Sequence, residues 1–155
     1  MLLAVFFSLT EARAQKTLPY EYGFENNDLA AEGWTMENCK PSTGINTNTK
    51  RTGDYAFYFT YSTNPPQYLI SPEFEGTSAM DVSFWYRPRS ANNPETFQVG
   101  YSTTTNATDA FTWEAELTAT DKDNWHQYET NFPTGTKFVA IRLNSSKKRV
   151  PPMTR

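Results

Sequence analysis

The sequence has no surplus of basic charge and no apolar run long enough to cross a membrane. It contains 14 lysines and arginines against 17 aspartates and glutamates, a formal net charge of −3. A chain with this balance has no basic field with which to neutralise a nucleic-acid backbone or an anionic lipid surface. The apolar run from Leu2 to Leu9 is far shorter than the roughly 20 residues that a spanning helix needs. We therefore expect no nucleic-acid partner and no transmembrane segment.

Cysteine and histidine are almost absent. Cys39 is the only cysteine, which excludes an internal disulfide, and we interpret it as a half-buried loop residue. His126 is the only histidine, so a catalytic dyad or triad that needs an imidazole would have to use it. The sequence also lacks a nucleophile-elbow glycine pattern, a phosphate-binding glycine loop and a cysteine–histidine metal cluster. We therefore expect no catalysis through His126.

One pair of acidic residues has a spacing that catalysis could use. Glu114 and Glu116 stand two apart in an expected strand, where paired carboxylates could perform glycosidase chemistry. Their side chains are expected to point to the same side as Thr112 and opposite Trp113, which is typical of an ordinary solvated face. We favour the solvated face, and the prediction for the whole chain is that it is not an enzyme.

Aromatic residues, by contrast, are plentiful, at 15% of the chain. They favour pleated sheets, and no sustained helical periodicity follows Gln15. Short alternating segments predict strands at 20–25, 55–61, 67–70, 80–86, 97–101, 111–117, 125–132 and 137–143. Within 80–86, Asp81, Ser83 and Trp85 are expected to point outward. The last two are expected to pair with each other across the turn at 133–135. The predicted fold class is all-β, a two-sheet antiparallel β-sandwich of the jelly-roll type.

The beginning of the chain differs from the rest. The apolar run is followed by Ala12-Arg13-Ala14, with small residues at the two positions that a signal peptidase inspects. We therefore predict a signal peptide at 1–14, with cleavage after Ala14 and export of the mature chain. A jelly-roll domain is predicted at 15–146 and an irregular tail at 147–155.

Six motifs occur in an order that is characteristic of one family. They are Gly23-Phe24-Glu25, Gly33-Trp34, Tyr68 to Pro72, Val82 to Tyr86, Trp125 to Tyr128 and Pro133 to Arg142. In this order, over roughly residues 20 to 144, the chain resembles the cleaved-adhesin or choice-of-anchor J domains of gingipain-type proteases and haemagglutinins of Bacteroidetes. The resemblance implies a jelly roll related to MAM domains, export, and a position beside other modules in a longer protein.

Two further expectations rest on this resemblance. Related jelly rolls commonly hold Ca²⁺ near the chain start, and Glu25 and Asp54 stand at the matching positions. Members also finish with an apolar strand that carries aspartates, whereas here Leu143 is followed by a basic, proline-containing tail that cannot form a central strand. We predict a truncation or frame change after about Ser146. The sheet edge that this leaves open would invite edge-to-edge self-association.

These observations together predict a non-catalytic adhesion or binding module. We expect it to be secreted or attached to the outer cell surface and to recognise an extracellular protein or glycan. Two alternatives stay open: a carbohydrate-binding accessory domain of a larger secreted hydrolase or peptidase, and a structural spacer. Trp34, Trp85 and Trp113 are the candidate ligand-binding residues, because an exposed indole can serve as a platform on which a sugar ring stacks.

Overall fold

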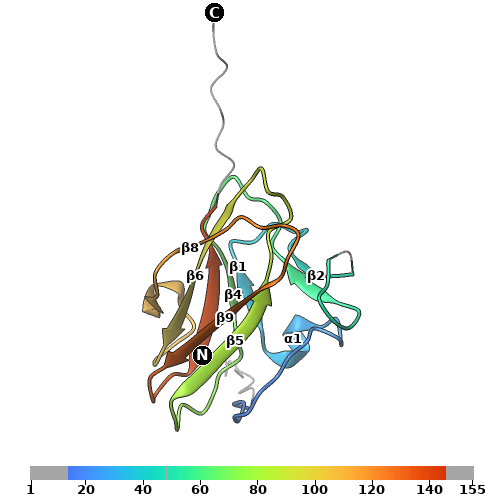
Figure 1. Ribbon diagram of the computed structural model, residues 1–155. Helices are drawn as coiled ribbons and strands as arrows, with labels where there is room; N and C mark the ends of the chain where they lie inside the picture. Colours follow the sequence, from blue (N-terminus) through green and yellow to red (C-terminus); the bar gives the residue numbers. More distant parts are fainter. Residues whose placement is uncertain (1–13, 48, 146–155) are drawn as a thin grey trace, which may run out of the picture.

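The computed structural model describes residues 14–47 and 49–145, and its regular structure is almost entirely β (Figure 1). Residues 1–13 of the predicted signal peptide and the predicted tail at 147–155 lie outside the described residues. The elements are α1 (Leu29–Glu32), β1 (Thr35–Glu37), β2 (Gly44–Asn46), β3 (Ala56–Tyr58), β4 (Gln67–Ile70), β5 (Met80–Tyr86), β6 (Glu95–Ser102), the 3-10 helix η1 (Thr108–Ala110), β7 (Thr112–Trp113), β8 (Leu117–Ala119), β9 (His126–Phe132) and β10 (Phe138–Leu143). The prediction of an all-β sandwich is confirmed.

The larger sheet has six strands and forms one layer of the sandwich. Its order is β1-β4-β10-β6-β7, and β8 pairs with the other half of β6. Neighbouring strands are antiparallel, and Ala140 in the middle of β10 lies opposite Ile70 of β4 and Gly100 of β6. A side-chain carbon at Gly100 would lie 2.6 Å from the ring of Trp113. Glycine is therefore needed where the Trp113 indole covers β6.

The opposite layer consists of two separate two-stranded sheets, β5–β9 and β2–β3 (Figure 1). β5 pairs with β9 along its full length. The alternation predicted for β5 is confirmed, since Met80 is buried while Asp81, Ser83 and Trp85 are exposed. Among the described residues no strand pairs with both β3 and β5, so the hydrogen-bonded layer is interrupted between them. We refer to β2, β3, β5 and β9 together as the split layer.

Strands β4 and β5 have the predicted bounds, whereas three other predictions were wrong in detail. No strand forms at 20–25, because Phe24 adopts a φ of 67°, which a β-strand does not accommodate. The segment 55–61 contributes only β3, whose last residue Tyr58 lies opposite Gly44, the first residue of its short partner β2. The segment 111–117 is divided, because β7 and β8 pair with different halves of β6.

The expected pairing of 125–132 with 137–143 was also wrong. β9 pairs with β5, and β10 lies between β4 and β6, so the two strands belong to different layers. The turn between them carries the chain across the sandwich, with Gly135 at a φ of 94° and the Thr136 N–H donating to the Pro133 carbonyl at 3.2 Å. The turn at 133–135 therefore reverses the chain between the two layers without forming a hairpin.

Two apolar clusters hold the domain together. The first fills the space between the layers, and its buried members are Phe97, Val99, Ala119, Tyr128, Phe132 and Leu143. The second is built from Ile70, Phe111, Phe138 and Ala140, with Tyr68 and Trp113 packed against it. Because Ala140 and Leu143 point to opposite faces of β10, the six-stranded sheet is apolar on both faces. β5 and β9, by contrast, expose their outward face.

Candidate functional site

The outward face of β5 and β9 is polar and open to solvent. Asn131 donates to the Asp81 carboxylate at 2.7 Å, directly across the strand pair. Along β9, Gln127 donates to the Glu129 carboxylate at 2.7 Å. A shallow hollow of about 400 Å³ lies here and is lined by Asp81, Val82, Ser83, Glu129 and Thr130. Convergent donors and acceptors of this kind can orient a polar ligand.

Trp85 is the most prominent side chain of this face. Its exposed fraction is 41%, which is large for an indole. The guanidinium of Arg51, from the loop before β3, lies 3.8 Å from the centre of the indole ring. Such a cation–π contact is worth about 0.5–1 kcal/mol at an exposed site. Because Arg51 precedes β3 and Trp85 lies on β5, this contact also joins the two halves of the split layer.

A second polar hollow lies against β2 and β3. It measures about 290 Å³ and is lined by Ser42, Asn46, Thr49, Tyr58, Thr60 and Arg89. Arg89 donates to the Tyr58 hydroxyl at 3.5 Å, and its guanidinium lies 5.9 Å from the Tyr58 ring centre. The hydroxyl of Thr60 is buried and has no hydrogen-bond partner within the described part of the chain. A polar ligand that reached this hydroxyl would remove the cost of leaving it unpaired.

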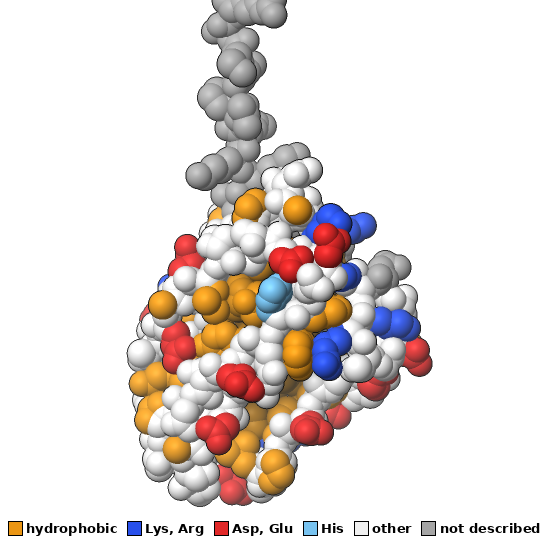
Figure 2. All heavy atoms as spheres, viewed as in Figure 1, with side chains coloured by type: hydrophobic (Ala, Val, Ile, Leu, Met, Phe, Trp, Pro, Cys, Tyr) orange, Lys and Arg blue, Asp and Glu red, His pale blue; other side chains and the backbone are white. Residues whose placement is uncertain are grey.

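We define the split-layer face as the two hollows together with Trp85 and Arg51. Figure 2 shows part of it: acidic side chains are scattered over β5 and β9, whereas basic side chains gather on the side of β2 and β3. Trp85 and Arg51 form a contact between the acidic and the basic halves. The face therefore offers acidic side chains over β5 and β9, a gathering of basic side chains nearer β2 and β3, and an accessible aromatic ring.

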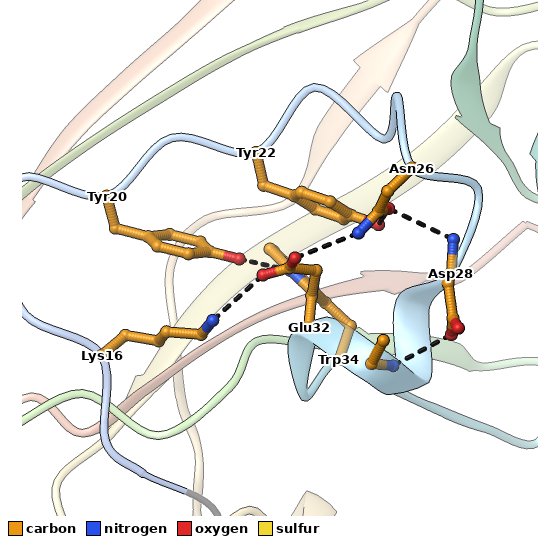
Figure 3. A network of polar contacts seen from close by, with 8 residues as sticks. Lys16, Tyr20, Tyr22, Asn26, Asp28, Glu32 and Trp34 are labelled. Carbon is orange, nitrogen blue, oxygen red and sulfur yellow. Dashed lines mark hydrogen bonds and ion pairs between the residues drawn. The ribbon is translucent and has the colours of Figure 1, made fainter.

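Trp34, the second predicted ligand-binding tryptophan, has a structural role. Its indole Nε1 donates to the Tyr20 hydroxyl at 3.1 Å, and its ring stacks on Tyr22 with centroids 5.9 Å apart. Beside it, Glu32 of α1 accepts hydrogen bonds from Lys16 and Asn26, both at 3.0 Å (Figure 3). This network ties the segment before α1 to the helix. Trp34 lines neither hollow.

Trp113, the third candidate, packs on the six-stranded sheet. Its ring lies 5.3 Å from Phe111 and 5.9 Å from Tyr68, measured between centroids. The Arg142 guanidinium lies 4.3 Å from the Trp113 ring centre and is itself held by two hydrogen bonds to the Gln98 side chain, at 2.9 and 2.6 Å. The structure therefore does not bring the three candidate tryptophans together, and of the three Trp85 is the exposed one.

The two predicted calcium ligands meet at the loop before β3. The Glu25 carboxylate accepts hydrogen bonds from the backbone N–H of Asp54 at 2.9 Å and of Tyr55 at 3.4 Å. Gly53 permits this approach, since its φ is +65° and a side-chain carbon there would lie 2.2 Å from Glu25 Oε1. The Asp54 carboxylate pairs with Lys50 at 3.2 Å.

These two carboxylates fit a calcium site incompletely. Ca²⁺ takes about six to eight oxygen ligands, and both carboxylates already have other partners. Within residues 14–47 and 49–145 no group of three or more Asp, Glu, His or Cys side chains gathers in a metal-binding arrangement. Calcium binding by Glu25 and Asp54 therefore stays a prediction, in which the ion would have to displace Lys50.

Comparison with known families places the fold. A family model described as the cleaved adhesin domain matches residues 6–149 of the chain. The chain belongs to the cleaved adhesin domain family. The match includes all six motifs on which the resemblance was based, so that inference is confirmed.

Solved cleaved adhesin domains have the same fold. The K1 and K3 domains of Lys-gingipain from Porphyromonas gingivalis W83 are 23% and 22% identical to this chain, with TM-scores of 0.64 and 0.62. The K1 alignment covers 74% of this chain and 82% of that domain, and the K3 alignment covers 73% and 81%. The K2 domain of Lys-gingipain is 21% identical, with a TM-score of 0.66 and coverage of 81% and 90%. None of the curated proteins compared matches the chain.

His126 of this cleaved adhesin domain faces a loop carboxylate. Its Nε2 lies 3.3 Å from Oδ2 of Asp121, and both side chains are substantially exposed. The side chain of Asn124 and the backbone N–H of Asp123 donate to Asp121 and lower the pKa of its carboxyl to about 2.

The half-buried Cys39 lies in a loop, as predicted, and burial raises the pKa of its thiol, which makes it a poor nucleophile at neutral pH.

The expectation that Glu114 lies on a solvated face was wrong. Its carboxylate is half-buried and accepts hydrogen bonds from the hydroxyls of Tyr128 at 2.5 Å and Thr130 at 2.8 Å, both on β9. Glu116 is exposed, as expected, and accepts from Asn144 at 2.7 Å. The strand alternation fails here because the chain leaves β7 after Trp113 and rejoins β6 only at Leu117. Glu114 is a link between the two layers.

Arg51, Tyr58 and Arg89 could not be identified as site residues from the sequence. Arg51 lies in a polar stretch without a strand pattern, and Arg89 lies in the loop after β5. A guanidinium is attracted to any aromatic ring, but which ring it meets depends on the fold.

No helix in the described part of this cleaved adhesin domain is long and apolar enough to span a bilayer.

Proposed function

We propose that this cleaved adhesin domain is a secreted or cell-surface adhesion module that binds an extracellular protein through its split-layer face and catalyses nothing. The observation that carries the proposal is the exposed indole of Trp85, which lies under Arg51 beside a polar hollow. Tryptophan and arginine are the side chains that most often dominate the energy of protein–protein contacts. Surrounding amides and carboxylates would supply orientation through hydrogen bonds.

A glycan is the second candidate ligand, and the same residue supports it. Sugar rings stack on exposed indoles, and the Asp81 and Glu129 carboxylates beside the hollow could accept hydrogen bonds from hydroxyl groups. Arg51 already lies 3.8 Å from the centre of the Trp85 ring. A sugar would have to displace this guanidinium or use the other side of the indole, and we therefore place a protein ligand first.

The non-catalytic part of the proposal is supported by the surroundings of the groups that could act on a substrate. His126 is engaged by Asp121 in an exposed loop, and Glu114 accepts two hydroxyl hydrogen bonds between the layers. General acid–base catalysis needs a positioned group within reach of a substrate proton. Neither His126 nor Glu114 lines one of the two hollows.

A paired binding assay tests the proposal. The wild-type domain and Trp85→Ala are applied to arrays of extracellular matrix proteins and glycans, and Met36→Ala serves as the matched control. Met36 is similarly exposed, at 42%, but lies on β1 of the other layer. We expect Trp85→Ala to weaken binding to a protein target about tenfold or more and Met36→Ala to leave it unchanged. Binding to glycans alone would favour the second candidate.

A hydrolase substrate panel is run on the same preparations. We expect no turnover from the wild-type domain. Turnover that is lost in His126→Ala or in Glu114→Gln would contradict the non-catalytic assignment. Silence on both arrays, or equal binding by Trp85→Ala, would contradict the assignment of the split-layer face.

A further inference from the structure

The interruption in the split layer leaves two strand edges without partners. β5 is hydrogen-bonded on one edge to β9, and β3 is hydrogen-bonded on one edge to β2. In the part of the chain that the structure describes, no strand pairs with the other edge of either. Unpaired edges present rows of N–H and C=O groups, which are templates for an additional extended chain.

Side-chain contacts join the two halves of the layer where backbone hydrogen bonds do not. Arg51, just before β3, lies over Trp85 of β5 at 3.8 Å from the ring centre. Arg89, just after β5, reaches the Tyr58 hydroxyl of β3 at 3.5 Å. One contact runs from the β3 side to β5, and the other runs from the β5 side to β3. These two contacts place β3 and β5 next to each other in the split layer.

The apolar side chains beside the interruption are incompletely covered. On β9, away from it, Tyr128 and Phe132 are buried. On β5, which borders it, Val82, Phe84 and Tyr86 face the same core cluster but are only half-buried. The aromatic side chains of Phe57 on β3 and of Phe59 just after it are half-buried as well. The apolar side chains of β3 and β5 therefore keep accessible surface, and covering it would be favourable.

Two arginines beside the interruption, Arg51 and Arg89, form no ion pair with an acidic side chain among the described residues. The ion pairs of the described chain involve Lys16, Lys50, Lys122, Lys137 and His126, and none includes Arg51 or Arg89. Both arginines make contact with aromatic rings instead. An incoming segment with carboxylates on its outward side would find complementary charge at this place.

We propose that the facing edges of β3 and β5 bind an extended acidic segment of a partner polypeptide, which inserts as one strand and pairs with both. Its inward side chains would be apolar and would cover Val82, Phe84 and Phe57, and its outward side chains would be carboxylates near Arg51 and Arg89. β5 of a second copy could not take this place, because its other edge is occupied by β9. The inserted strand would lie within the split-layer face and rests on that proposed function, because Arg51 and Arg89 belong to it, but backbone pairing with β3 and β5 does not require the Trp85 indole.

Amide hydrogen exchange with designed peptides tests the insertion. The probe is a blocked peptide as long as β5, seven residues, in which valine alternates with aspartate. Two further versions carry N-methyl groups on either alternate set of backbone nitrogens, and a fourth has lysine in place of aspartate. We expect the unmodified aspartate peptide at millimolar concentration to slow exchange in both β3 and β5 by about tenfold. Either N-methylated version should fail, because a strand between two others needs hydrogen bonds on both edges.

Charge reversal on the protein provides the matched test of sequence preference. In the double variant Arg51→Glu with Arg89→Glu we expect about tenfold weaker binding of the aspartate peptide and stronger binding of the lysine peptide. Lys122→Glu, which changes charge in the loop before β9, should behave like the wild type. Circular dichroism confirms that the variants are folded.

Each other result overturns the proposal. Unchanged exchange with the aspartate peptide means that the edges do not bind such a segment. Failure of only one N-methylated version means that the peptide adds to a single edge. If the double arginine variant still prefers the aspartate peptide to the lysine peptide, Arg51 and Arg89 do not recognise the carboxylates of the segment. Sedimentation that shows dimers whose β5 amides are protected without peptide assigns the edge to a second copy.

Discussion

The two layers of this domain differ in what their strands cover. In β10 of the six-stranded sheet the run Phe138 to Ile141 is continuously apolar, and its side chains enter one apolar cluster on each face. In β5 of the split layer Asp81, Ser83 and Trp85 alternate with apolar residues, and one face stays open to water. Continuous apolar runs are typical of strands buried on both sides, and alternation is typical of strands at the surface. The pattern of apolar residues within a strand therefore indicates which layer the strand joins, and it does so better than the identity of the strands that precede and follow it in the sequence.

The two layers also differ in role: the six-stranded sheet contributes more to stability, and the split layer is better suited to recognition. The six-stranded sheet contains Ile70 and Val99, which have 0% and 1% of their surface exposed. The split layer contains the exposed Trp85, two polar hollows and an interrupted backbone ladder. Segments with fewer buried contacts open at lower free-energy cost, which suits a binding surface. We therefore expect substitutions in the two layers to have unequal effects on unfolding.

The largest expected effect comes from one residue type placed in both layers. Val99→Ala in β6 removes a fully buried side chain and should lower the free energy of unfolding by about 2–3 kcal/mol. Val82→Ala in β5 removes a half-buried side chain and should cost about 1 kcal/mol or less. Urea denaturation followed by fluorescence measures both. Equal costs would show that the layers do not differ as described.

Calcium binding at the loop before β3 would stabilise the side of the domain that carries the split layer. If Glu25 and Asp54 bind the ion, a few millimolar Ca²⁺ should raise the free energy of unfolding by about 1–2 kcal/mol, as for a weak extracellular site. Asp54→Asn should abolish the response while the Glu25 carboxylate keeps its bonds to the backbone. Thermal melting with calcium and with a chelator measures the effect. Identical melting curves would contradict calcium binding.

A smaller effect is expected where the layers are linked by Glu114. Tyr128→Phe removes the hydroxyl that donates to this carboxylate at 2.5 Å and should cost about 1 kcal/mol at neutral pH. Burial and the bond to Glu114 raise the pKa of Tyr128 above its ordinary 10.0, so folding favours the protonated phenol. The stability that this provides is present below pH 10 and is lost as the pH rises further.

Alkaline unfolding therefore provides the readout for Tyr128. The loss of stability above pH 10 should be smaller in Tyr128→Phe than in the wild type. Tyr61→Phe is the control, because this side chain is exposed at 43% and lies outside the core clusters. Identical alkaline profiles for the wild type and Tyr128→Phe would show that the link between the layers does not contribute.

The smallest expected effect concerns the exposed loop before β9. The pKa of Asp121 is lowered to about 2, so its ionised form stabilises the fold above its ordinary 3.8 and this stability is lost as the pH falls toward 2. In Asp121→Asn the melting temperature should vary less between pH 2 and 4 than in the wild type. Asp123→Asn, in the same loop, is the matched control. A steeper acid dependence in Asp121→Asn would contradict the assignment.

The sequence was informative wherever a structural rule acts within one strand. The alternation in β5 predicted which side chains are exposed, and Trp85 was among them. The pairing between strands was harder to predict from the sequence. The turn at 133–135 suggested a hairpin, but the two strands that it connects belong to different layers. Glu114 was misplaced for the same reason, since its partners Tyr128 and Thr130 lie on a distant strand. Pairings of this kind depend on the assembled sandwich, and no local pattern encodes them.

The position of Trp85 gives this domain a built-in optical reporter. The other three tryptophans are half-buried, so Trp85 is the indole whose fluorescence depends most directly on the solvent. The Arg51 guanidinium lies 3.8 Å from the ring centre, so a ligand that moves the arginine or covers the ring should change that emission. A titration followed at one emission wavelength can therefore detect a partner of the split-layer face without a label, and Trp85→Phe will make the protein blind to it.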